Sequence, residues 1–453
     1  MFVHVVKRGD TIWSIARRYN VSPQRIISDN AIPNPQNLVL GQALLILIPK
    51  TVHTVTAGDT LPLIAMAYDT SVLTLMQNNP VLISNPVLVP GQTLVIDFTE
   101  EKRRSLVINS YAYPYINQDV LRRALPYLTY LTIFGYGFTL EGDLIEIDDQ
   151  PLINLAYEYR TAPVMLISSI TEEGTFSGSK ASVLFNDVNL QNKVIDNIID
   201  IMVEKGYVGL DVDFEYIEPK DGEAYLRFLE NVISQLHPMG FFVNTDLAPK
   251  TSGRQAGLLY EAHNYPEIGA ISDTVLLMTY EWGYTYGPPM AVAPLNKVAE
   301  VLDYAVTEIP PEKILMGIPN YGYDWQLPFE RGVTRATTIG NQQAIEIAAR
   351  YGAEIQFDET AQSPYFEYFT RNGVKHVVWF EDIRSIQQKL DLADEFRLRG
   401  VGYWNIMRPF AQNWALISAL YDVQKVVFEY CIPDATRSGM FHSRYPFRRV
   451  PAF

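Results

Sequence analysis

Three carboxylates alternate along one short hydrophobic stretch of the chain, and their spacing suits acid catalysis. The stretch, residues 207–217, reads YVGLDVDFEYI, and its β-branched and aromatic residues predict a strand that runs into a loop. Because successive side chains of a strand point to opposite faces, Asp211, Asp213 and Glu215 should share one face. Carboxylates so close together raise one another's pKa, and burial adds to this effect. At least one of them should therefore hold a proton near neutral pH, as a general acid must.

Two other interpretations of this acidic face remain open. It could be the solvated side of a surface strand, or it could bind magnesium or calcium, which prefer carboxylate oxygens. The chain has no nearby phosphate-cradling glycine loop and no HExxH motif. Its single cysteine, Cys431, allows neither an intrachain disulfide nor a cysteine cluster, and no two of its six histidines have metal-ligand spacing. We therefore expect no metal and no cofactor.

The elements around the acidic stretch must place it at one end of a sheet. Strand-like runs alternate with helical segments, which predicts a parallel sheet covered by helices. Eight such runs between about residues 99 and 430 match a (β/α)8 TIM barrel, an α/β fold whose active sites lie at the carboxyl ends of its strands. The runs include the acidic stretch and others that begin at Ser105, Tyr127, Ala162, Gly240, Thr274, Lys313 and Val401.

Two further segments are predicted beside the barrel. The spacing after the seventh run, KILMGIPNYGYDW, is too long for one helix, so an α+β insertion is expected at about 326–382. It should contain a helix at Asn341–Tyr351 and strand-like ends, AEIQFD and HVVWFED. Residues 431–453 fit no barrel element and carry four arginines among aromatic residues. We expect this tail to pack loosely on the barrel rather than to bind nucleic acid.

The first hundred residues repeat themselves. Residues 3–30 return as residues 52–79, and each copy closes with a similar element, LVLGQALLI or LVPGQTLVI. Each copy predicts a strand, a Gly-Asp-Thr turn in which Asp10 or Asp59 caps a helix, a second helix and a closing strand. Two small βααβ domains are thus expected at 1–49 and 50–98, joined to the barrel by the charged linker DFTEEKRR, Asp97–Arg104.

Composition excludes several classes of function. The chain of 453 residues is 48% hydrophobic and 19% charged, which is typical of a globular protein. Its formal net charge of −15 disfavours nucleic acid and anionic membrane surfaces as partners. No stretch reaches 18 apolar residues, and the N-terminus lacks the charged region and apolar core of a secretory signal peptide, so deployment without Sec export is expected. The sequence indicates no oligomeric state.

The two N-terminal copies resemble the LysM domain, whose members bind polymers of N-acetylglucosamine (GlcNAc) such as peptidoglycan and chitin. The shared features are the Gly-Asp-Thr turn, a helical Ala-x-x-Tyr, an Asn and the Gly-Gln element. Two weak sites in tandem would raise avidity if both reach one polymer. The resemblance implies sugar contacts from two loops of each copy, at Gly9, Asp10, Thr11, Ile32 and Asn34, and at Gly58, Asp59, Thr60, Leu82 and Ser84.

The acidic stretch, the strand series and the insertion together resemble glycoside hydrolase family 18, whose signature is DxxDxDxE at the end of strand four. The last three acids match, whereas the first position is Val208, which we expect to change the pKa network without abolishing activity. The resemblance implies that Glu215 protonates the glycosidic oxygen. It further implies that Asp213 holds the substrate's acetamide group and that Asp211 shares a proton with Asp213.

Other family residues recur at the ends of later strands. The family's Met-x-Tyr-Asp matches Met278, Tyr280 and, with a conservative change, Glu281; the resemblance implies that Tyr280 hydrogen-bonds the acetamide oxygen. Trp404 matches the tryptophan under the sugar, whereas the usual SxGG of strand three is not visible. The full set expected to bind substrate is Trp404, Met278, Glu281, Asn320, Tyr321 and Asp246.

This family works by substrate-assisted catalysis, in which the enzyme supplies an acid and no nucleophile. The resemblance implies that the 2-acetamido group of the sugar attacks its own C1 to give an oxazolinium ion, which water opens with retention. The sugar before the cleaved bond must therefore carry an N-acetyl group.

The whole architecture resembles the spore cortex-lytic glycosidases of the YaaH and SleL type. It implies an N-acetylglucosaminidase that cleaves β-1,4 bonds after GlcNAc in spore cortex peptidoglycan, or in its fragments, during germination, and that resides in the coat or cortex region. Two alternatives stay open. One is a chitinase or a vegetative-wall endo-β-N-acetylglucosaminidase, and the other is a non-catalytic peptidoglycan-binding coat protein.

Overall fold

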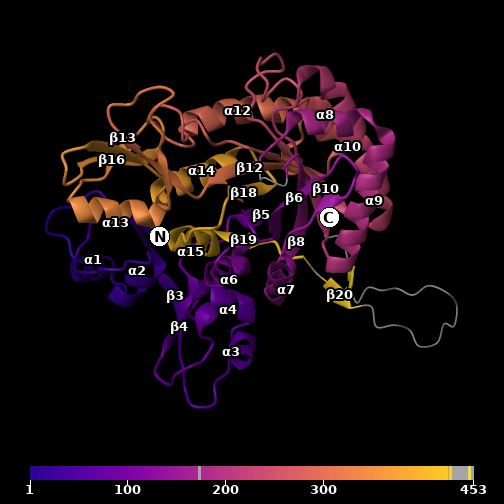
Figure 1. The fold of residues 1–453 in the computed structure, drawn as a ribbon. Coiled ribbons are helices and arrows are strands. Elements are labelled where there is room, and N and C mark those ends of the chain that lie inside the picture. Colours follow the sequence, from indigo (N-terminus) through magenta and orange to yellow (C-terminus); the bar gives the residue numbers. More distant parts are fainter. Residues whose placement is uncertain (172–174, 427, 431–446, 450–453) are drawn as a thin grey trace, which may run out of the picture.

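A computed structural model describes residues 1–171, 175–426, 428–430 and 447–449 of the chain (Figure 1). Eight parallel strands form a closed barrel, in the order β5-β18-β12-β11-β10-β9-β8-β6, and β6 pairs with β5 to close it. The prediction of a (β/α)8 barrel is confirmed. The strands are β5 (Arg104–Ala112), β6 (Tyr130–Phe138), β8 (Ala162–Ser168), β9 (Gly209–Asp213), β10 (Phe242–Leu247), β11 (Thr274–Leu277), β12 (Ile314–Pro319) and β18 (Gly400–Trp404).

Helices cover the outside of the barrel and bury its outward-facing side chains in one large apolar core. Their apolar residues recur every three or four positions, which places them on one face. The longest helix begins at the cap Asp187, whose side chain accepts two backbone N–H groups, and ends at Gly206 in the left-handed conformation. The helices are α6 (Gln118–Ala124), α7 (Gln150–Glu158), α8 (Gly178–Asn186), α9 (Val188–Lys205), α10 (Gly222–Leu236), α11 (Tyr265–Ile271), α12 (Leu295–Glu308), α14 (Ile383–Glu395) and α15 (Ala411–Leu420).

Strand β9 alternates as its sequence predicts. Leu210, Val212 and Phe214 are fully buried against the surrounding helices. Asp211 lies opposite Leu166 of β8 and Asn244 of β10, so its side chain faces the barrel interior with theirs. The acidic face is therefore the inside of the barrel and not a solvated surface.

Val208, at the first signature position, precedes β9 and lies in a small apolar cluster with Ala162 and Val164. Glu215 lies beyond the other end of the strand. The cluster is formed where β8 begins, away from the carboxyl ends of the strands. The predicted effect of Val208 on the pKa network stays a prediction.

An antiparallel sheet and a helix separate β12 from α14. The helix α13 (Asn341–Tyr351) spans the predicted residues. The predicted start near residue 326 is too late, because β13 begins at Gly322 and pairs with β17 and β14. Strand β12 stops at Pro319, since proline has no N–H for the ladder. The sheet has the order β14-β13-β17-β16-β15, with β13 (Gly322–Gln326), β14 (Thr337–Ile339), β15 (Gln356–Asp358), β16 (Ser363–Phe369) and β17 (Lys375–Trp379).

Two small βααβ units precede the barrel, as predicted. In the first, β1 (Phe2–Val5) pairs antiparallel with β2 (Ala43–Ile46), and in the second β3 (Pro49–Thr54) pairs antiparallel with β4 (Thr93–Phe98). The second unit has one additional short helix, α5. The helices are α1 (Ile12–Tyr19) and α2 (Pro23–Asp29) in the first unit, and α3 (Leu61–Ala67), α4 (Val72–Asn78) and α5 (Val81–Ser84) in the second.

The expected helix caps in these units are wrong by one residue. Thr11 and Thr60 are the N-caps, and each threonine hydroxyl accepts a backbone N–H of the first turn. Asp10 instead accepts the N–H of Lys7 at 2.9 Å and binds the His4 ring at 2.9 Å. Asp59 makes the same two contacts in the second unit. Each aspartate thus accepts a hydrogen bond within the turn that precedes the helix, and the threonine after it is the N-cap.

The predicted linker is shorter than expected and is anchored. Asp97 belongs to β4 and Arg104 to β5, so only residues 99–103 connect the two strands. Within this segment Lys102 donates to the carbonyl of Ser418, and Arg103 forms an ion pair with Asp391 at 2.6 Å. The connection therefore fixes the second unit against the barrel.

Hydrogen bonds also join both N-terminal units to the barrel directly. Gln412 donates to Asn30 of the first unit at 2.7 Å, and Ser418 donates to Asn78 of the second at 2.8 Å. The first unit lies beside α13 and α15, and the second projects from the base (Figure 1). Both N-terminal units are therefore fixed to the barrel by specific contacts.

Most of the predicted C-terminal tail lies outside the described residues. Within it, β21 (Phe447–Arg449) pairs antiparallel with β20 (Phe428–Tyr430). In the described part of the chain, no helix has the length and apolar character needed to cross a bilayer. The same residues contain no cluster of three or more His, Cys, Asp or Glu side chains that could hold a metal ion.

Candidate active site

A cleft of about 490 Å³ opens at the carboxyl ends of the barrel strands. The acidic face of β9 supplies part of its base, and the loops after the strands supply its walls. Its lining consists mainly of carboxylates and aromatic rings: Tyr113, Phe134, Phe176, Asp213, Glu215, Tyr216, Asp246, Pro249, Leu259, Tyr260, Met278, Tyr280, Glu281, Trp282, Tyr284 and Trp404.

Asp211 lies below the cleft in a buried hydrogen-bond network. Its carboxylate accepts the Tyr111 hydroxyl at 2.8 Å and the Asn244 amide at 2.7 Å. Both donors also reach Asp246, at 2.9 and 3.0 Å, so the two aspartates face each other across shared partners. Burial raises the pKa of Asp211 in spite of these donors. Burial, and then the charge of Asp211, holds the pKa of Asp246 well above its ordinary value.

Asp213 lies at the end of β9 between this network and the cleft. Its side chain is buried, and Oδ1 has no hydrogen-bond partner among the described residues. Burial raises the pKa of Asp213 well above its ordinary value, and the charges of Glu215 and Asp211 add to this. A neutral, protonated Asp213 is the form that this environment favours at neutral pH. Asp211 shares its hydrogen-bond donors with Asp246. That Asp211 shares a proton with Asp213, as the family resemblance implies, stays a prediction.

Glu215 follows β9 and lines the cleft. Burial, and then the charge of Glu281, raises the pKa of Glu215 to about 7. A carboxyl group with this pKa exists in both protonation states near neutral pH, so it can give a proton and take one back. The arrangement therefore supplies one acid–base group beside buried acids whose pKa values are raised.

Glu281 is held in place by two tyrosines of the insertion side. Its carboxylate accepts the hydroxyl of Tyr321 and that of Tyr323, the latter at 3.0 Å. Its backbone is in the left-handed region, with φ of 67°, which turns the chain sharply after β11. Burial raises the pKa of Glu281 although both hydroxyls stabilise its charge. Glu281, which replaces the family's aspartate, thus has two tyrosine hydroxyls that donate to its carboxylate.

A buried histidine ties two strand ends together. The His263 ring accepts the N–H of Ala248 at 2.8 Å through Nδ1, and its Nε2 donates to the carbonyl of Phe214 at 3.2 Å. Phe214 stands between Asp213 and Glu215 in the chain. These partners fix the neutral tautomer, and burial lowers the pKa of His263 to about 4. His263 therefore holds the backbone that carries the candidate acid.

Lys250 reinforces this connection from the same loop. Its Nζ donates to the His263 carbonyl at 2.9 Å, and its backbone N–H donates to the Tyr265 hydroxyl at 3.0 Å. We call His263, Lys250 and Tyr265 the bracket. Sequence reasoning missed it, because a single histidine far from the acidic stretch carries no local signal of its contacts.

The structure brings together most of the residues predicted to act on substrate. Met278, Tyr280, Glu281, Trp404 and Asp246 line the cleft with Asp213 and Glu215. Tyr321 lies behind Glu281 and contacts it. Asn320 does not line the cleft. Its side-chain amide donates to the backbone carbonyls of Asn405 and Arg408 at 3.1 and 2.9 Å. Its contacts hold two loops together.

Aromatic rings form an apolar floor and one wall of the cleft. The Trp404 ring packs against Phe134 and Tyr113, with centroids 5.4 and 6.0 Å apart. Phe176 and Tyr115 are exposed, and their rings pack against Phe134 and Tyr113, with centroids 6.3 and 5.3 Å apart. Rings of this kind pack on the apolar face of a sugar while their edges stay near water. Phe176 lines the wall next to strand three, where the family's SxGG motif was not visible; residues 172–174 of that loop are outside the described part.

The predicted sugar-contact loops of the two N-terminal units have different surroundings. In the first unit Gly9, Thr11 and Asn34 are exposed, and the segment from Ile32 to Asn34 lines a cavity of about 260 Å³ against α13. In the second unit Gly58, Thr60 and Ser84 are exposed. The side chains of Ile32 and Leu82 are buried in the small cores, so they support these loops from within.

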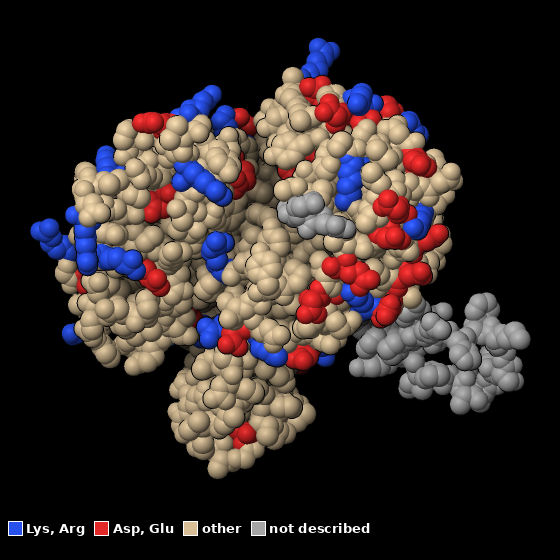
Figure 2. Space-filling view, in the orientation of Figure 1, with Lys and Arg blue, Asp and Glu red and all other residues tan. Residues whose placement is uncertain are grey.

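The two units also differ in charge. Between residues 51 and 96 the second unit has only Asp59 and Asp69 as ionised residues, whereas the first carries five Lys and Arg. Figure 2 shows the lower lobe, formed by the second unit, as almost free of charged atoms. Its exposed side chains include Leu63, Met66 and Val87.

The barrel with its buried carboxylates and the two N-terminal units are the architecture of a glycoside hydrolase with LysM domains. The model of glycosyl hydrolases family 18 matches residues 155–408, and the LysM domain matches residues 4–47 and 53–97. The chain therefore belongs to glycosyl hydrolases family 18, is a glycoside hydrolase, and carries two LysM domains.

The chain matches two relatives over almost their whole length. The chain is 41% identical to the "Cortical fragment-lytic enzyme" of Bacillus subtilis (strain 168), over 94% of this chain and 100% of that protein. The crystal structure of the Bacillus megaterium QM B1551 spore cortex-lytic enzyme SleL is 38% identical and has a TM-score of 0.80, over 94% of this chain and 99% of that one. A chitinase from Chromobacterium violaceum, 23% identical with a TM-score of 0.65, shares the barrel fold. The predicted resemblance to spore cortex-lytic enzymes is confirmed.

Proposed function

We propose that this protein is an N-acetylglucosaminidase that cleaves β-1,4 bonds after GlcNAc in spore cortex peptidoglycan, or in fragments of it, during germination. The observation that carries the proposal is Glu215, a cleft carboxyl group with a pKa of about 7 beside the protonated Asp213. The names of the relatives, a cortical fragment-lytic enzyme and a spore cortex-lytic enzyme, support the choice of polymer.

In this proposal the reaction proceeds with retention and needs no enzyme nucleophile. Glu215 gives its proton to the glycosidic oxygen as the bond to C1 breaks. The acetamide oxygen of the same sugar attacks C1, while Asp213 and the Tyr280 hydroxyl hold and polarise the acetamide group. An oxazolinium ion forms. Glu215, now ionised, takes a proton from water, which adds to C1 and opens the ring.

The surrounding residues have supporting roles in the proposal. Trp404 forms the floor beneath the sugar, and Met278 lies beside it. Glu281 keeps the pKa of Glu215 high and is itself oriented by Tyr321. Burial, and then the charges of Glu215 and Asp211, keep the pKa of Asp213 high, so Asp213 is neutral until the acetamide group arrives.

We also propose the wider setting of the enzyme. The peptidoglycan ligand, the coat or cortex location and the domain limits 1–49, 50–98 and 99–430 with a tail from 431 are all part of this proposal. The ranges matched by the LysM and family 18 models support the limits. The relatives' printed names support the location.

Glu215→Gln tests the proposal, because glutamine keeps the shape of the side chain and removes its proton. Decoated spore cortex is digested with the wild type and with the variant, and the new reducing ends are identified by mass spectrometry. We expect GlcNAc reducing ends from the wild type and a loss of roughly 10²-fold or more in the variant. Equal products from both proteins, or cortex binding without any release, would contradict the proposal.

Colloidal chitin, digested in parallel, separates this proposal from a chitinase. Both polymers place GlcNAc before the cleaved bond, so the cleft alone accepts either. Release of GlcNAc termini from chitin alone would exclude action on cortex.

A further inference from the structure

A cavity lies between the two LysM domains and the barrel, away from the catalytic cleft. It measures about 590 Å³, which is within the range of small-ligand sites. Its walls come from the end of α2 in the first LysM domain, from Pro80–Ser84 in the second, from α6 and from the loop after β18. We call it the joint cavity. Its residues have no part in the chemistry proposed for the cleft.

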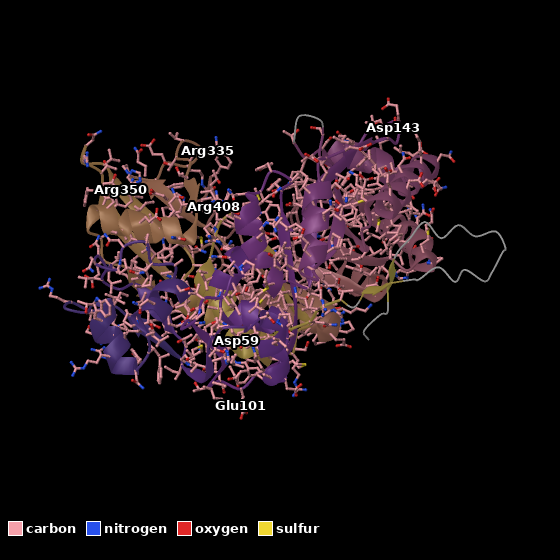
Figure 3. The ribbon with its side chains drawn as sticks, turned by 90° about the horizontal axis from the view of Figure 1, so that it is seen from below. Asp59, Glu101, Asp143, Arg335, Arg350 and Arg408 are labelled. Atoms are coloured by element: carbon pink, nitrogen blue, oxygen red, sulfur yellow. The ribbon has the colours of Figure 1, made fainter. Side chains whose placement is uncertain are left out.

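Two arginines line the joint cavity without ion-pair partners among the described residues. Arg123 comes from the last turn of α6, and Arg408 comes from the loop after β18. Arg408 and Arg350 lie at opposite ends of α13 (Figure 3). The chain has a formal net charge of −15, so a cavity lined by two guanidinium groups without ion pairs is locally positive where the protein as a whole is negative. They favour an anionic ligand, and a carboxylate matches their geometry.

A buried acid supplies the second observation. Asp29 lines the joint cavity and is 1% exposed. Its Oδ2 accepts Arg25 at 2.6 Å, but its Oδ1 has no partner in the part of the chain that the structure describes. A buried carboxylate oxygen without a donor is costly, so the site favours a ligand that brings an N–H or O–H group.

We infer that the joint cavity binds the carboxylate-bearing peptide stem of a peptidoglycan strand. A peptide stem carries free carboxylates for Arg123 and Arg408, and amide N–H groups for Asp29. A neutral GlcNAc unit offers no group that would use two arginines. This inference rests on the proposed action on peptidoglycan.

The position of the cavity agrees with a strand held by the LysM domains. Ser84, in the predicted sugar-contact loop of the second domain, lines the joint cavity. Ala31 lines both this cavity and the neighbouring one formed by Ile32–Asn34. An extended stem of three residues spans about 10 Å.

Titration calorimetry of the full-length protein with N-acetylmuramyl-L-alanyl-D-isoglutamine tests the inference. This probe has a peptide stem and no glycosidic bond to cleave, so the wild type can be used. We expect saturable binding that weakens with salt and falls roughly tenfold or more in Arg123→Gln and in Arg408→Gln. Arg122→Gln is the matched control, because Arg122 precedes Arg123 in α6, pairs with Glu158 at 3.3 Å and lies outside the cavity.

Chitotriose, which has no carboxylate, serves as the second probe, and it is measured with Glu215→Gln present in every protein so that it is not cleaved. It should bind the Arg123 variant as tightly as the wild type, and this also shows that the variant is folded. The inference is overturned if the wild type does not bind the muramyl peptide at millimolar concentration, if Arg122→Gln and Arg123→Gln bind it equally, or if chitotriose binding depends equally on Arg123. Release of GlcNAc termini from peptide-free glycan, measured separately, distinguishes these failures from failure of the proposed hydrolase.

Discussion

Carboxylates have opposite environments in the barrel and in the LysM domains. Asp213 and Asp246 are buried among other acids, and burial holds the pKa of each well above its ordinary value. Burial also acts on Asp10, but the Lys7 N–H and the His4 ring outweigh it, so the pKa of Asp10 is lowered. The N–H of Thr56 and then the ring of His53 lower the pKa of Asp59 in the same way.

The direction of the pKa shift distinguishes carboxylates that stabilise the fold from carboxylates that are able to hold a proton for chemistry. An acid whose charge is stabilised by fixed donors strengthens a fold, because ionisation favours the native state. An acid that is buried without enough donors holds its proton and can lend it to a substrate. The role of an aspartate or glutamate therefore depends on its hydrogen-bond donors, and the sequence alone does not identify these donors.

The largest effect expected from breaking this arrangement is on catalysis through the bracket. His263→Ala removes the ring that connects Phe214 to Ala248, so the backbone before Glu215 should shift. We expect kcat to fall by roughly 10- to 100-fold with a smaller change in KM, because the acid would be misplaced. Steady-state kinetics on soluble glycan fragments measures both constants.

Two comparisons show whether His263 acts by position. His263→Gln, whose amide can still donate to the Phe214 carbonyl, should lie between the wild type and the alanine variant. His237→Ala, which removes an exposed histidine paired with Asp273, should leave kcat unchanged. A loss of activity that is the same for both alanine variants would contradict the positional role.

Acid should release the same bracket in the wild type. The pKa of His263 is lowered to about 4 from an ordinary value near 6.5, so its neutral form favours the native state. This stability is fully present above about pH 6.5 and is lost as the pH falls through about 4. Thermal unfolding of the wild type and of His263→Gln should therefore differ less at pH 4 than at pH 7.

A smaller effect is expected from Glu281→Gln, which removes the charge that helps to raise the pKa of Glu215. The pKa of Glu215 should fall below about 7, so the alkaline limb of kcat/KM should move to lower pH. At pH 7 the loss should be roughly a few-fold. Glu300→Gln, at an exposed pair with Lys297, is the control, and an unmoved limb would show that Glu281 does not set this pKa.

The smallest effects are on stability, and they should differ in sign between the two regions. Asp10→Asn should lower the free energy of unfolding at pH 7 by about 1 kcal/mol, and Asp59→Asn by less, because their ionised forms accept fixed donors. This contribution is present above the ordinary pKa near 4 and is lost as the pH falls through the lowered native value. Asp246→Asn should leave stability equal or higher, since asparagine resembles the protonated acid.

Denaturant unfolding at pH 7 and at pH 3 measures these three variants. If Asp246→Asn destabilised the protein at pH 7 as much as Asp10→Asn, the two regions would not differ in the way proposed.

Local patterns predicted the individual elements well and their connections poorly. The alternation in residues 207–217, the repeat of the LysM domains and the helix at Asn341–Tyr351 are each encoded in a short window. The capping threonines, the start of β13 and the length of the linker were misplaced. Each of these features depends on a hydrogen bond or a strand partner that lies outside the short stretch of sequence that predicts the element.

By itself the sequence determined the barrel, the two LysM domains and the face that Asp211 and Asp213 share, because periodicity and repeat spacing are properties of neighbouring residues. Only the tertiary structure decided which acids interact. It placed Asp246 beside Asp211, His263 behind Phe214, and Arg123 with Arg408 on one cavity. The physical reason is that pKa, hydrogen bonding and cavity charge depend on distances in space, and the closure of the barrel sets those distances between residues far apart in the chain.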